Sequence, residues 1–157
     1  MDPLSTPARL RGLATWLLGQ SSNQGHRLIV DRLHAVGVTS RSHYSLLLAL
    51  AEAGPTSQAD LGRRVGLDRS DVTAGVTGLE EKGYLERTPD PTDRRRNLVR
   101  ITDSGTEFLA KLNTEVGAAQ EELLTPLSPE ERQALIGMLV RVVEHHTKLQ
   151  LSDTAER

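Results

Sequence analysis

Cysteine is absent from the 157 residues of the chain, and this absence excludes several kinds of chemistry at once. Without thiols there is no disulfide framework, no thiolate metal site, no cysteine nucleophile and no thiol redox sensor. A reducing compartment fits this composition. Aromatic residues make up only 3% of the chain, which argues against the stacked rings with which proteins hold single-stranded nucleic acid.

Long apolar runs and familiar catalytic motifs are missing as well. No stretch of about 18 apolar residues occurs, and no apolar segment follows a basic N-terminal region, so the sequence predicts neither a membrane span nor a signal peptide. We therefore expect a cytoplasmic protein. Because there is no phosphate-binding glycine loop, no HExxH motif and no Ser/His/Asp set at a recognised spacing, we expect neither enzyme activity nor a cofactor.

The pair His145 and His146, beside Glu144, comes nearest to a metal or acid–base site. Adjacent residues on a helix point in different directions, so these side chains are not expected to converge on one ion. We predict no metal site.

The net charge of −2 is unevenly distributed along the chain. The segment Leu61–Arg100 carries nine Lys or Arg against seven Asp or Glu, whereas Ile101–Arg157 carries five against ten. A locally basic middle with an acidic flank suits a protein that touches DNA along one surface and avoids it elsewhere.

The N-terminal segment Ala8–Val36 is predicted to form one long helix or two in line, with Gly37 at its exit. Its polar stretch 19–25 contains two glycines, each costing about 1 kcal/mol in a helix interior, so the sequence leaves open whether the helix is continuous there or is kinked or broken. Trp16, the only tryptophan, has two interpretations: it lines a ligand cavity, or, as is commoner among leucines on an amphipathic helix, it belongs to the core or a dimer contact.

Three helices with clear start signals follow. Thr39 and Ser40 can cap a helix that ends at Gly54-Pro55, and Ser57 and Asp60 have the spacing of a capping box before a short helix that closes at Gly66. Asp68 caps the next helix, whose apolar positions Val72, Val76 and Leu79 fall on one face. Two short helices joined by a glycine turn predict a helix-turn-helix. The outer face of the second is small or hydrogen-bonding and able to reach base edges: Arg69, Ser70, Thr73, Ala74 and Thr77.

The stretch Asp90–Thr102 resembles a charged hairpin tip. Turn-forming residues precede three successive arginines, and short extended segments flank them on both sides, which predicts a wing. A loop that concentrates arginine favours an anion, although charge between strands is also typical of a plain solvated turn. Its position directly after a helix-turn-helix favours the DNA-binding interpretation.

The C-terminal part is predicted to contain two further helices. Thr102 or Asp103 caps the first, and Ser128-Pro129-Glu130-Glu131 is a start signal for the second. The apolar positions of the second helix wrap around more than one face, so it needs a partner beyond its own domain, and a two-fold related copy is the economical choice.

Taken together, these elements resemble the MarR family of bacterial winged-helix regulators from about Arg9 to Thr147. The resemblance rests on 67–85 (LDRSDVTAGVTGLEEKGYL), on Asp90-Pro91-Thr92-Asp93-Arg94-Arg95 and on Ile101-Thr102-Asp103-Ser104-Gly105. It implies a mainly α fold with a small β-hairpin wing, a single domain over residues 1–157. Segments 8–37 and 103–150 would be dimerisation helices, and 39–102 the winged helix-turn-helix.

The resemblance also assigns roles within the wing. It implies an ion pair between Asp93 and Arg95, and a wing arginine that reaches the minor groove, for which Arg94 is our candidate, with Arg96 for nearby phosphate. We also expect Ser57 and Gln58 to contact DNA. Family members often carry a basic residue at the position of Ala74 or Gly78, which this chain lacks, so readout of the major groove is expected to rely on the hydroxyl-bearing residues of the recognition helix.

The sequence therefore predicts a sequence-specific, double-stranded DNA-binding transcription regulator that binds a pseudo-palindromic operator as a homodimer. We expect a repressor released by a small aromatic or natural-product effector, with Trp16, His43 and Tyr44 as candidate pocket residues. Two alternatives remain open: a winged-helix protein-interaction module without DNA binding, and an activator with no small-molecule ligand.

Overall fold

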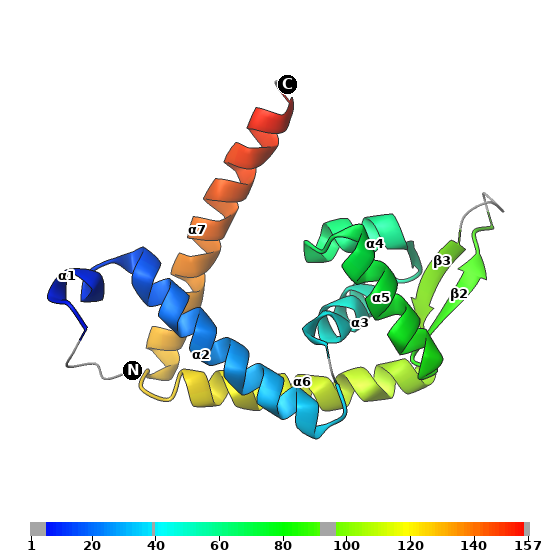
Figure 1. The fold of residues 1–157 in the computed structure, drawn as a ribbon, viewed down its shortest axis with the longest axis horizontal. Helices are drawn as coiled ribbons and strands as arrows, with labels where there is room; N and C mark the ends of the chain where they lie inside the picture. Colours follow the sequence, from blue (N-terminus) through cyan, green and yellow to red (C-terminus); the bar gives the residue numbers. More distant parts are fainter. Residues whose placement is uncertain (1–5, 39, 92–96, 156–157) are drawn as a thin grey trace. The chain divides into compact units, whose positions relative to one another are not determined.

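A computed structural model describes residues 6–38, 40–91 and 97–155 of the chain. These residues form two compact units, one up to Ala119 and one from Gln120 onward, and each is described by itself. The fold is mainly helical with one small antiparallel sheet (Figure 1), as the sequence predicts. Among the described residues the helices are α1 Ala8–Arg11, α2 Ala14–Ala35, α3 Arg41–Ala53, α4 Gln58–Val65, α5 Arg69–Glu81, α6 Asp103–Leu123 and α7 Pro129–Ala155.

Helix α2 runs without a break through the polar stretch 19–25, which answers the question that the sequence left open. The interruption in the N-terminal arm falls instead at Gly12 and Leu13, between α1 and α2. Gly25 is buried on α2, and burial against a neighbouring element can offset the cost of about 1 kcal/mol that glycine carries in a helix. Periodicity alone could not show that packing.

The predicted N-cap residues are correct for two of the three helices α3, α4 and α5. Ser57 caps α4 by accepting a hydrogen bond from Asp60 N at 3.2 Å, and Asp68 caps α5 by accepting one from Asp71 N at 2.9 Å. Ser40 stands at the N-cap of α3 but makes no capping bond, because its hydroxyl is paired with the Ser42 hydroxyl at 2.7 Å. Thr39, the other expected cap, lies outside the described residues.

The sheet has three strands, β1 Thr56–Ser57, β2 Leu85–Pro89 and β3 Asn97–Ile101, in the order β1-β3-β2. Strands β2 and β3 pair from Leu85↔Ile101 to Pro89↔Asn97, which is the predicted hairpin. The sequence did not predict β1, which adds Thr56 opposite Val99. This short strand anchors the start of α4 to the wing.

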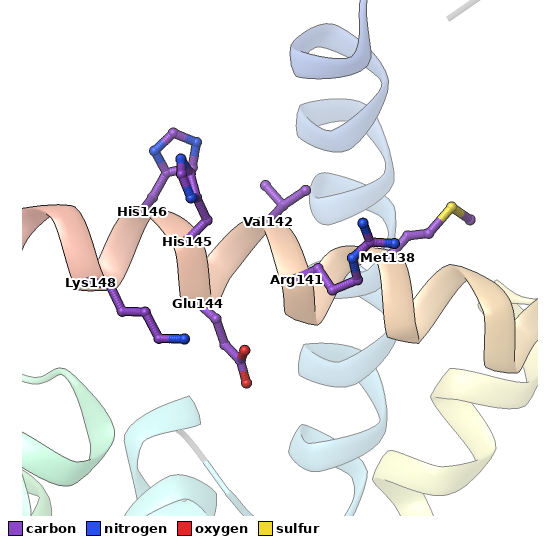
Figure 2. A pocket seen from close by; sticks show the side chains of 7 residues that line it. All are labelled: Met138, Arg141, Val142, Glu144, His145, His146 and Lys148. Carbon is purple, nitrogen blue, oxygen red and sulfur yellow. The ribbon is translucent and has the colours of Figure 1, made fainter.

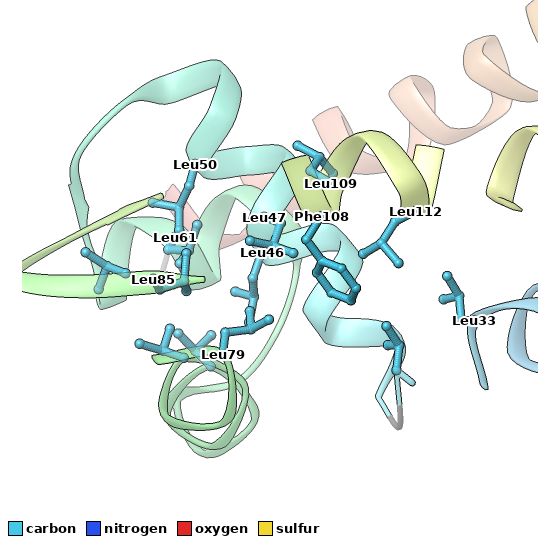
Figure 3. Close-up of a cluster of buried hydrophobic side chains, with 14 residues drawn as sticks. Leu33, Leu46, Leu47, Leu50, Leu61, Leu79, Leu85, Phe108, Leu109 and Leu112 are labelled. Carbon is cyan, nitrogen blue, oxygen red and sulfur yellow. The ribbon is translucent and has the colours of Figure 1, made fainter. Parts of the chain in front are cut away.

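One hydrophobic core joins the helices and the sheet of the first unit (Figure 3). Side chains of α3, α5 and α6 gather around β2 and β3, and Tyr84 stacks on Phe108 with ring centroids 4.2 Å apart. At about 25 cal/mol per Å² of apolar surface, this burial is the main source of stability. The core residues are Leu33, Val38, Leu46, Leu47, Leu50, Leu61, Val72, Val76, Leu79, Leu85, Val99, Phe108, Leu109 and Leu112.

The second unit is built around α7, which starts with the predicted capping box. Glu131 N donates to the Ser128 hydroxyl at 3.3 Å, and Ser128 N donates to Glu131 Oε2 at 2.8 Å. Arg132 fastens the preceding turn by donating to the carbonyl oxygens of Leu124 and Leu127, each at 3.0 Å. Beyond this corner α7 leaves large apolar side chains exposed: Ile136, Met138, Val140, Val142, Val143 and Leu149.

None of the helices in the described ranges has the length and apolar character needed to cross a bilayer.

Gly105, near the start of α6, provides a test of the packing between the wing and α6. A Cβ there would lie 2.1 Å from the Tyr84 carbonyl oxygen and 2.8 Å from Ile101 Cγ1. Because backbone cannot yield easily, we expect Gly105→Ala to lower the free energy of unfolding by about 1–3 kcal/mol.

Gly117→Ala, on the same helix, is the matched control, since a Cβ at Gly117 would meet nothing within 4 Å. We expect it to stabilise the protein by up to about 1 kcal/mol. Urea unfolding of both variants measures the difference, and equal midpoints for Gly105→Ala and wild type would contradict the packing described.

Candidate nucleic-acid interface

Helices α4 and α5 form a helix-turn-helix whose turn is set by glycine. Gly66 ends α4 with φ of +66°, a left-handed conformation that glycine adopts without strain. A Cβ at Gly62 would lie 3.1 Å from both the Leu67 carbonyl oxygen and Val72 Cγ2. Glycine at position 66 therefore permits the turn, and glycine at position 62 lets the two helices approach closely.

The N-terminus of α5 is stabilised by a carboxylate. Hydrogen bonds from the Ser70 hydroxyl and from the backbone of Asp71 lower the pKa of Asp68 below its ordinary value. The carboxylate is thus held ionised next to the positive end of the helix dipole, where negative charge is favourable.

The outer face of α5 carries the predicted base-reading residues. Arg69, Ser70, Thr73 and Ala74 are exposed, while Thr77 and Gly78 are half-buried. Together with Glu81 they line one open hollow of about 830 Å³. The structure therefore brings the five predicted residues of this helix onto one accessible surface.

The hydroxyl groups on that surface are already engaged. Ser70 donates to Asp68 Oδ1 at 2.7 Å, and Thr73 donates to the Arg69 carbonyl oxygen at 2.8 Å. Thr77 Oγ1 accepts a hydrogen bond from Arg87 Nη2 at 3.2 Å. The sequence did not show these bonds, which leave the Ser70 and Thr73 hydroxyl oxygens as acceptors and the Thr77 hydroxyl as a donor.

Ser57 and Gln58 lie at the start of α4. Ser57 is buried, and its hydroxyl both accepts from Asp60 N and donates to Asp60 Oδ2 at 2.6 Å. Gln58 Oε1 is buried without a hydrogen-bond partner in the described part of the chain. Gln58 also lines a hollow of about 720 Å³ between α4 and α5. DNA contact by these two residues stays a prediction.

Most residues of the predicted wing tip are not among those that the structure describes. Asp93, Arg94, Arg95 and Arg96 lie outside the described residues, so the predicted ion pair and the DNA-facing arginines stay predictions. What the structure does describe is the paired stem, which extends to Pro89↔Asn97. Glu86 and Arg100, which face each other in this register, form an ion pair.

Arg87 on β2 ties the wing stem to α5, and sequence analysis missed it. Its guanidinium forms an ion pair with Glu80 and donates to Thr77, both on α5. The pair is largely shielded, since the Arg87 side chain is 25% exposed and that of Glu80 34%. In the sequence, the only sign of this contact is that Glu80 and Arg87 carry opposite charges and lie seven residues apart across a turn. The contact couples the orientation of the wing to that of the recognition helix.

His43 of α3 lies beneath α5. A Cβ at Gly78 would come within 3.4 Å of His43 Nε2, so the imidazole lies close against the helix backbone there. His43 is only 7% exposed. Burial lowers the pKa of the His43 imidazole below its ordinary value, and the positive charge of Lys82 at the end of α5 lowers it further. The imidazole is therefore neutral near neutral pH.

The three candidate effector residues have different surroundings. Trp16 is half-buried on α2, and His43 is packed under α5. Tyr44 donates its hydroxyl to Asn113 Oδ1 on α6 at 3.0 Å and lines a hollow of about 400 Å³ with residues of α3 and α4. His43 and Tyr44 are neighbours in the chain, but nothing in the structure joins either of them to Trp16 in a shared cavity within the described residues.

The histidine pair on α7 does not form a converging site. His145, His146 and Glu144 border a hollow of about 700 Å³ whose lining comes from this one helix. Figure 2 shows Glu144 pointing away from the two imidazole rings. In the part of the chain that the structure describes, no three His, Cys, Asp or Glu side chains are grouped so that they could hold a metal ion.

Comparison with known sequences relates this chain to DNA-binding regulators. A family model described as the MarR family matches residues 36–96, which contain the helix-turn-helix and the first part of the wing. The uncharacterised HTH-type transcriptional regulator YdgJ of Bacillus subtilis (strain 168) is 36% identical over 117 residues, 74% of this chain and 71% of that protein.

Two solved structures are similar in fold. The transcriptional repressor CouR, bound to a 23-mer DNA duplex, has a TM-score of 0.79 and 26% identity, covering 87% of this chain and 96% of that one. The PcaV regulator of Streptomyces coelicolor, in complex with its natural ligand, has a TM-score of 0.71 and 29% identity, covering 88% of this chain and 97% of that one.

The buried imidazole predicts a specific dependence of stability on pH. The unfolded chain binds a proton near the ordinary histidine pKa of about 6.5, whereas folding disfavours that proton at His43. The free energy of unfolding should therefore be unaffected by this group above about pH 6.5 and should fall as the pH drops below it. His43→Gln removes the titration and should flatten this fall.

Thermal unfolding between about pH 7.5 and about pH 5.5 measures the effect. The exposed His34 of α2 offers the matched control, because His34→Gln should leave the pH dependence of wild type intact. The same loss of stability in wild type and His43→Gln would show that the buried imidazole is not its source.

Proposed function

The chain belongs to the MarR family of transcriptional regulators, and we propose that it is a homodimeric repressor that leaves a pseudo-palindromic operator when a small-molecule effector binds. The family and the named relative are transcriptional regulators, which are not enzymes, as the sequence predicted. The observation that carries the proposal is the accessible outer face of α5 beside a paired β2–β3 stem.

The proposed DNA contacts come from two elements. The outer face of α5 enters the major groove with Arg69 at its N-terminal end, because recognition helices of this kind contact base edges through their first turns. The wing contacts the flanking minor groove through Arg94, with Arg96 on phosphate and Asp93–Arg95 holding the tip. Ser57 and Gln58, at the start of α4, contact the sugar-phosphate backbone of the DNA. CouR, whose fold is similar, is a repressor seen with a DNA duplex.

Exposed apolar side chains support a homodimer. On α7, Ile136 is 53% and Val143 64% exposed, and on α2, Leu17 is 44% exposed. Water-exposed patches of this kind mark interaction surfaces, and a two-fold copy covers the same patch on both subunits. We assign dimerisation to segments 8–37 and 103–150, DNA binding to 39–102, and a cytoplasmic location because the operator is DNA of the cell.

The effector is proposed to be a small aromatic acid or natural product. PcaV, which is similar in fold, was solved with its natural ligand. Trp16, His43 and Tyr44 are the pocket residues we propose, on α2 and α3. A ligand between these helices would act by shifting the dimer toward a form with a different spacing of its recognition helices.

An alternative function is a protein-interaction module that uses the winged helix without DNA. An activator without a small-molecule ligand is the other alternative. Selection of bound duplexes from a random DNA library separates the first from the proposed function, because an interaction module would enrich no sequence. A pseudo-palindromic consensus with half-sites one helical turn apart is the expected result.

Arg94→Ala tests the wing contact on the selected duplex. We expect weaker binding and a decrease of about one unit in the slope of log affinity against log salt concentration, since one phosphate-neutralising charge is lost. Lys111→Ala, at an exposed position of α6, is the control and should leave the slope unchanged. An unchanged slope for Arg94→Ala would mean that this arginine does not contact DNA.

A panel of phenolic acids and natural products tests the effector. At about a hundredfold excess over its dissociation constant, a true effector should stabilise the protein by about 2.7 kcal/mol and weaken duplex binding. Binding should change the fluorescence of Trp16, the only tryptophan. Trp16→Phe then separates two roles of the ring. If the effector still stabilises the variant fully, Trp16 only reports binding; if the stabilisation is reduced, Trp16 contacts the ligand. No shift in melting temperature or duplex affinity across the panel would contradict the effector proposal.

A further inference from the structure

The outer face of α5 is chemically unusual for a recognition helix, because its charges stand at the two ends. Arg69 lies at the start of the face and Glu81 at its end. Between them the lining consists of small side chains and a glycine: Ser70, Thr73, Ala74, Thr77 and Gly78. Whatever the middle of this face recognises must therefore be read by hydroxyl oxygens and methyl groups.

The hydrogen bonds that these hydroxyl groups already make decide which of their atoms remain free to contact a base. The Ser70 hydroxyl already donates its proton to Asp68 Oδ1, and the Thr73 hydroxyl donates to the Arg69 carbonyl oxygen. Thr77 accepts a hydrogen bond from Arg87 and keeps its own hydroxyl proton to donate. Thr73, whose hydroxyl is bonded to the preceding turn, has its methyl group left for contact, and Ala74 lines the same hollow. The part of the face made by Thr73 and Ala74 thus offers apolar surface and a hydrogen-bond acceptor.

This inventory matches one kind of base pair. In the major groove guanine presents two acceptors, N7 and O6, and needs a donor that Thr73 and Ala74 do not supply. Thymine presents its C5 methyl group, which packs against alanine and threonine methyls, and its adenine partner presents the N6 donor. The groups of this face that can donate to a guanine are the Arg69 guanidinium at one end and the Thr77 hydroxyl nearer the other.

We propose that the recognition helix selects its half-site by packing Thr73 and Ala74 against thymine C5 methyl groups, with guanine read outside these two residues. The inference rests on the proposed function and makes Thr73 and Ala74 specificity-determining residues. It accounts for the absence of a long basic side chain at Ala74 and Gly78, since such a side chain would hold the helix away from a methyl group.

Base analogues test the inference without altering the protein. In the duplex selected from the random library, each thymine is replaced in both half-sites by deoxyuridine, which lacks only the methyl group. We expect one or two positions per half-site where affinity falls about fourfold for each methyl removed. Replacing such a thymine by cytosine and then by 5-methylcytosine should recover about fourfold of the loss, because the methyl returns while the pair stays G·C.

Thr73→Ser connects the effect to a residue, since it removes the methyl and keeps the hydroxyl. Because both subunits carry the change, we expect this variant to bind the thymine duplex about fourfold more weakly for each half-site and to lose nothing further on the deoxyuridine duplex. Thr114 on α6 makes the same bond to the carbonyl four residues back, at 3.2 Å to Ala110 O. Thr114→Ser is therefore the matched control and should bind both duplexes as wild type does.

The outcomes separate this inference from the function on which it rests. If the library yields no enriched duplex, the proposed function fails and the inference falls with it. If a duplex is enriched and bound, yet deoxyuridine changes affinity less than twofold at every thymine, only methyl reading is overturned. Equal sensitivity of Thr73→Ser and wild type to deoxyuridine would likewise remove Thr73 from the readout.

Discussion

Close packing of α5 on α3 is the contact on which the proposed DNA-binding surface depends. A Cβ at Gly75 would stand 2.5 Å from Leu46 Cδ1, and Leu46 is fully buried in the core. The helix therefore lies so close to α3 that a Cβ at position 75 would require the buried Leu46 side chain to shift. The outward side chains Thr73 and Ala74 project from that same helix, so their depth is set by the core beneath them. Core packing of this kind resists small displacements, because side chains there have no empty space to move into.

The wing stem is tied to the same framework by polar bonds. Arg87 joins β2 to Glu80 and Thr77 of α5, and Thr102 donates its hydroxyl to the Gly83 carbonyl oxygen at 2.7 Å while accepting from Gly105 N at 3.0 Å. The first bond orients the wing against the recognition helix, and the second pair fastens the wing to the start of α6. Helix, wing stem and the beginning of α6 are thus positioned by contacts within one compact unit.

What could be predicted from the sequence was local. The capping pairs at Ser57 and Asp60, at Asp68 and Asp71 and at Ser128 and Glu131 lie three residues apart, so composition and spacing suffice to find them. The apolar periodicity of α5 likewise gave its buried face.

The features that were missed depend on contacts between distant segments. Strand β1 exists because Thr56 and Ser57 meet β3 more than 40 residues later along the chain, and α2 continues through two glycines where the sequence left a break open. The hydroxyl bonds of Ser70 and Thr73 are local, but propensity does not say which of several partners a hydroxyl chooses. That choice leaves Ser70 and Thr73 with acceptor oxygens and no free hydroxyl proton, so much of the affinity has to come from elsewhere. Arg63 and Arg64 of α4 are exposed, and the wing sequence adds three arginines.

Attraction and selectivity reside in different elements of the proposed interface. Attraction to phosphate falls with salt concentration, whereas methyl packing does not. A change in the wing would then alter binding to all sequences alike, whereas a change at Thr73 would alter the choice among them.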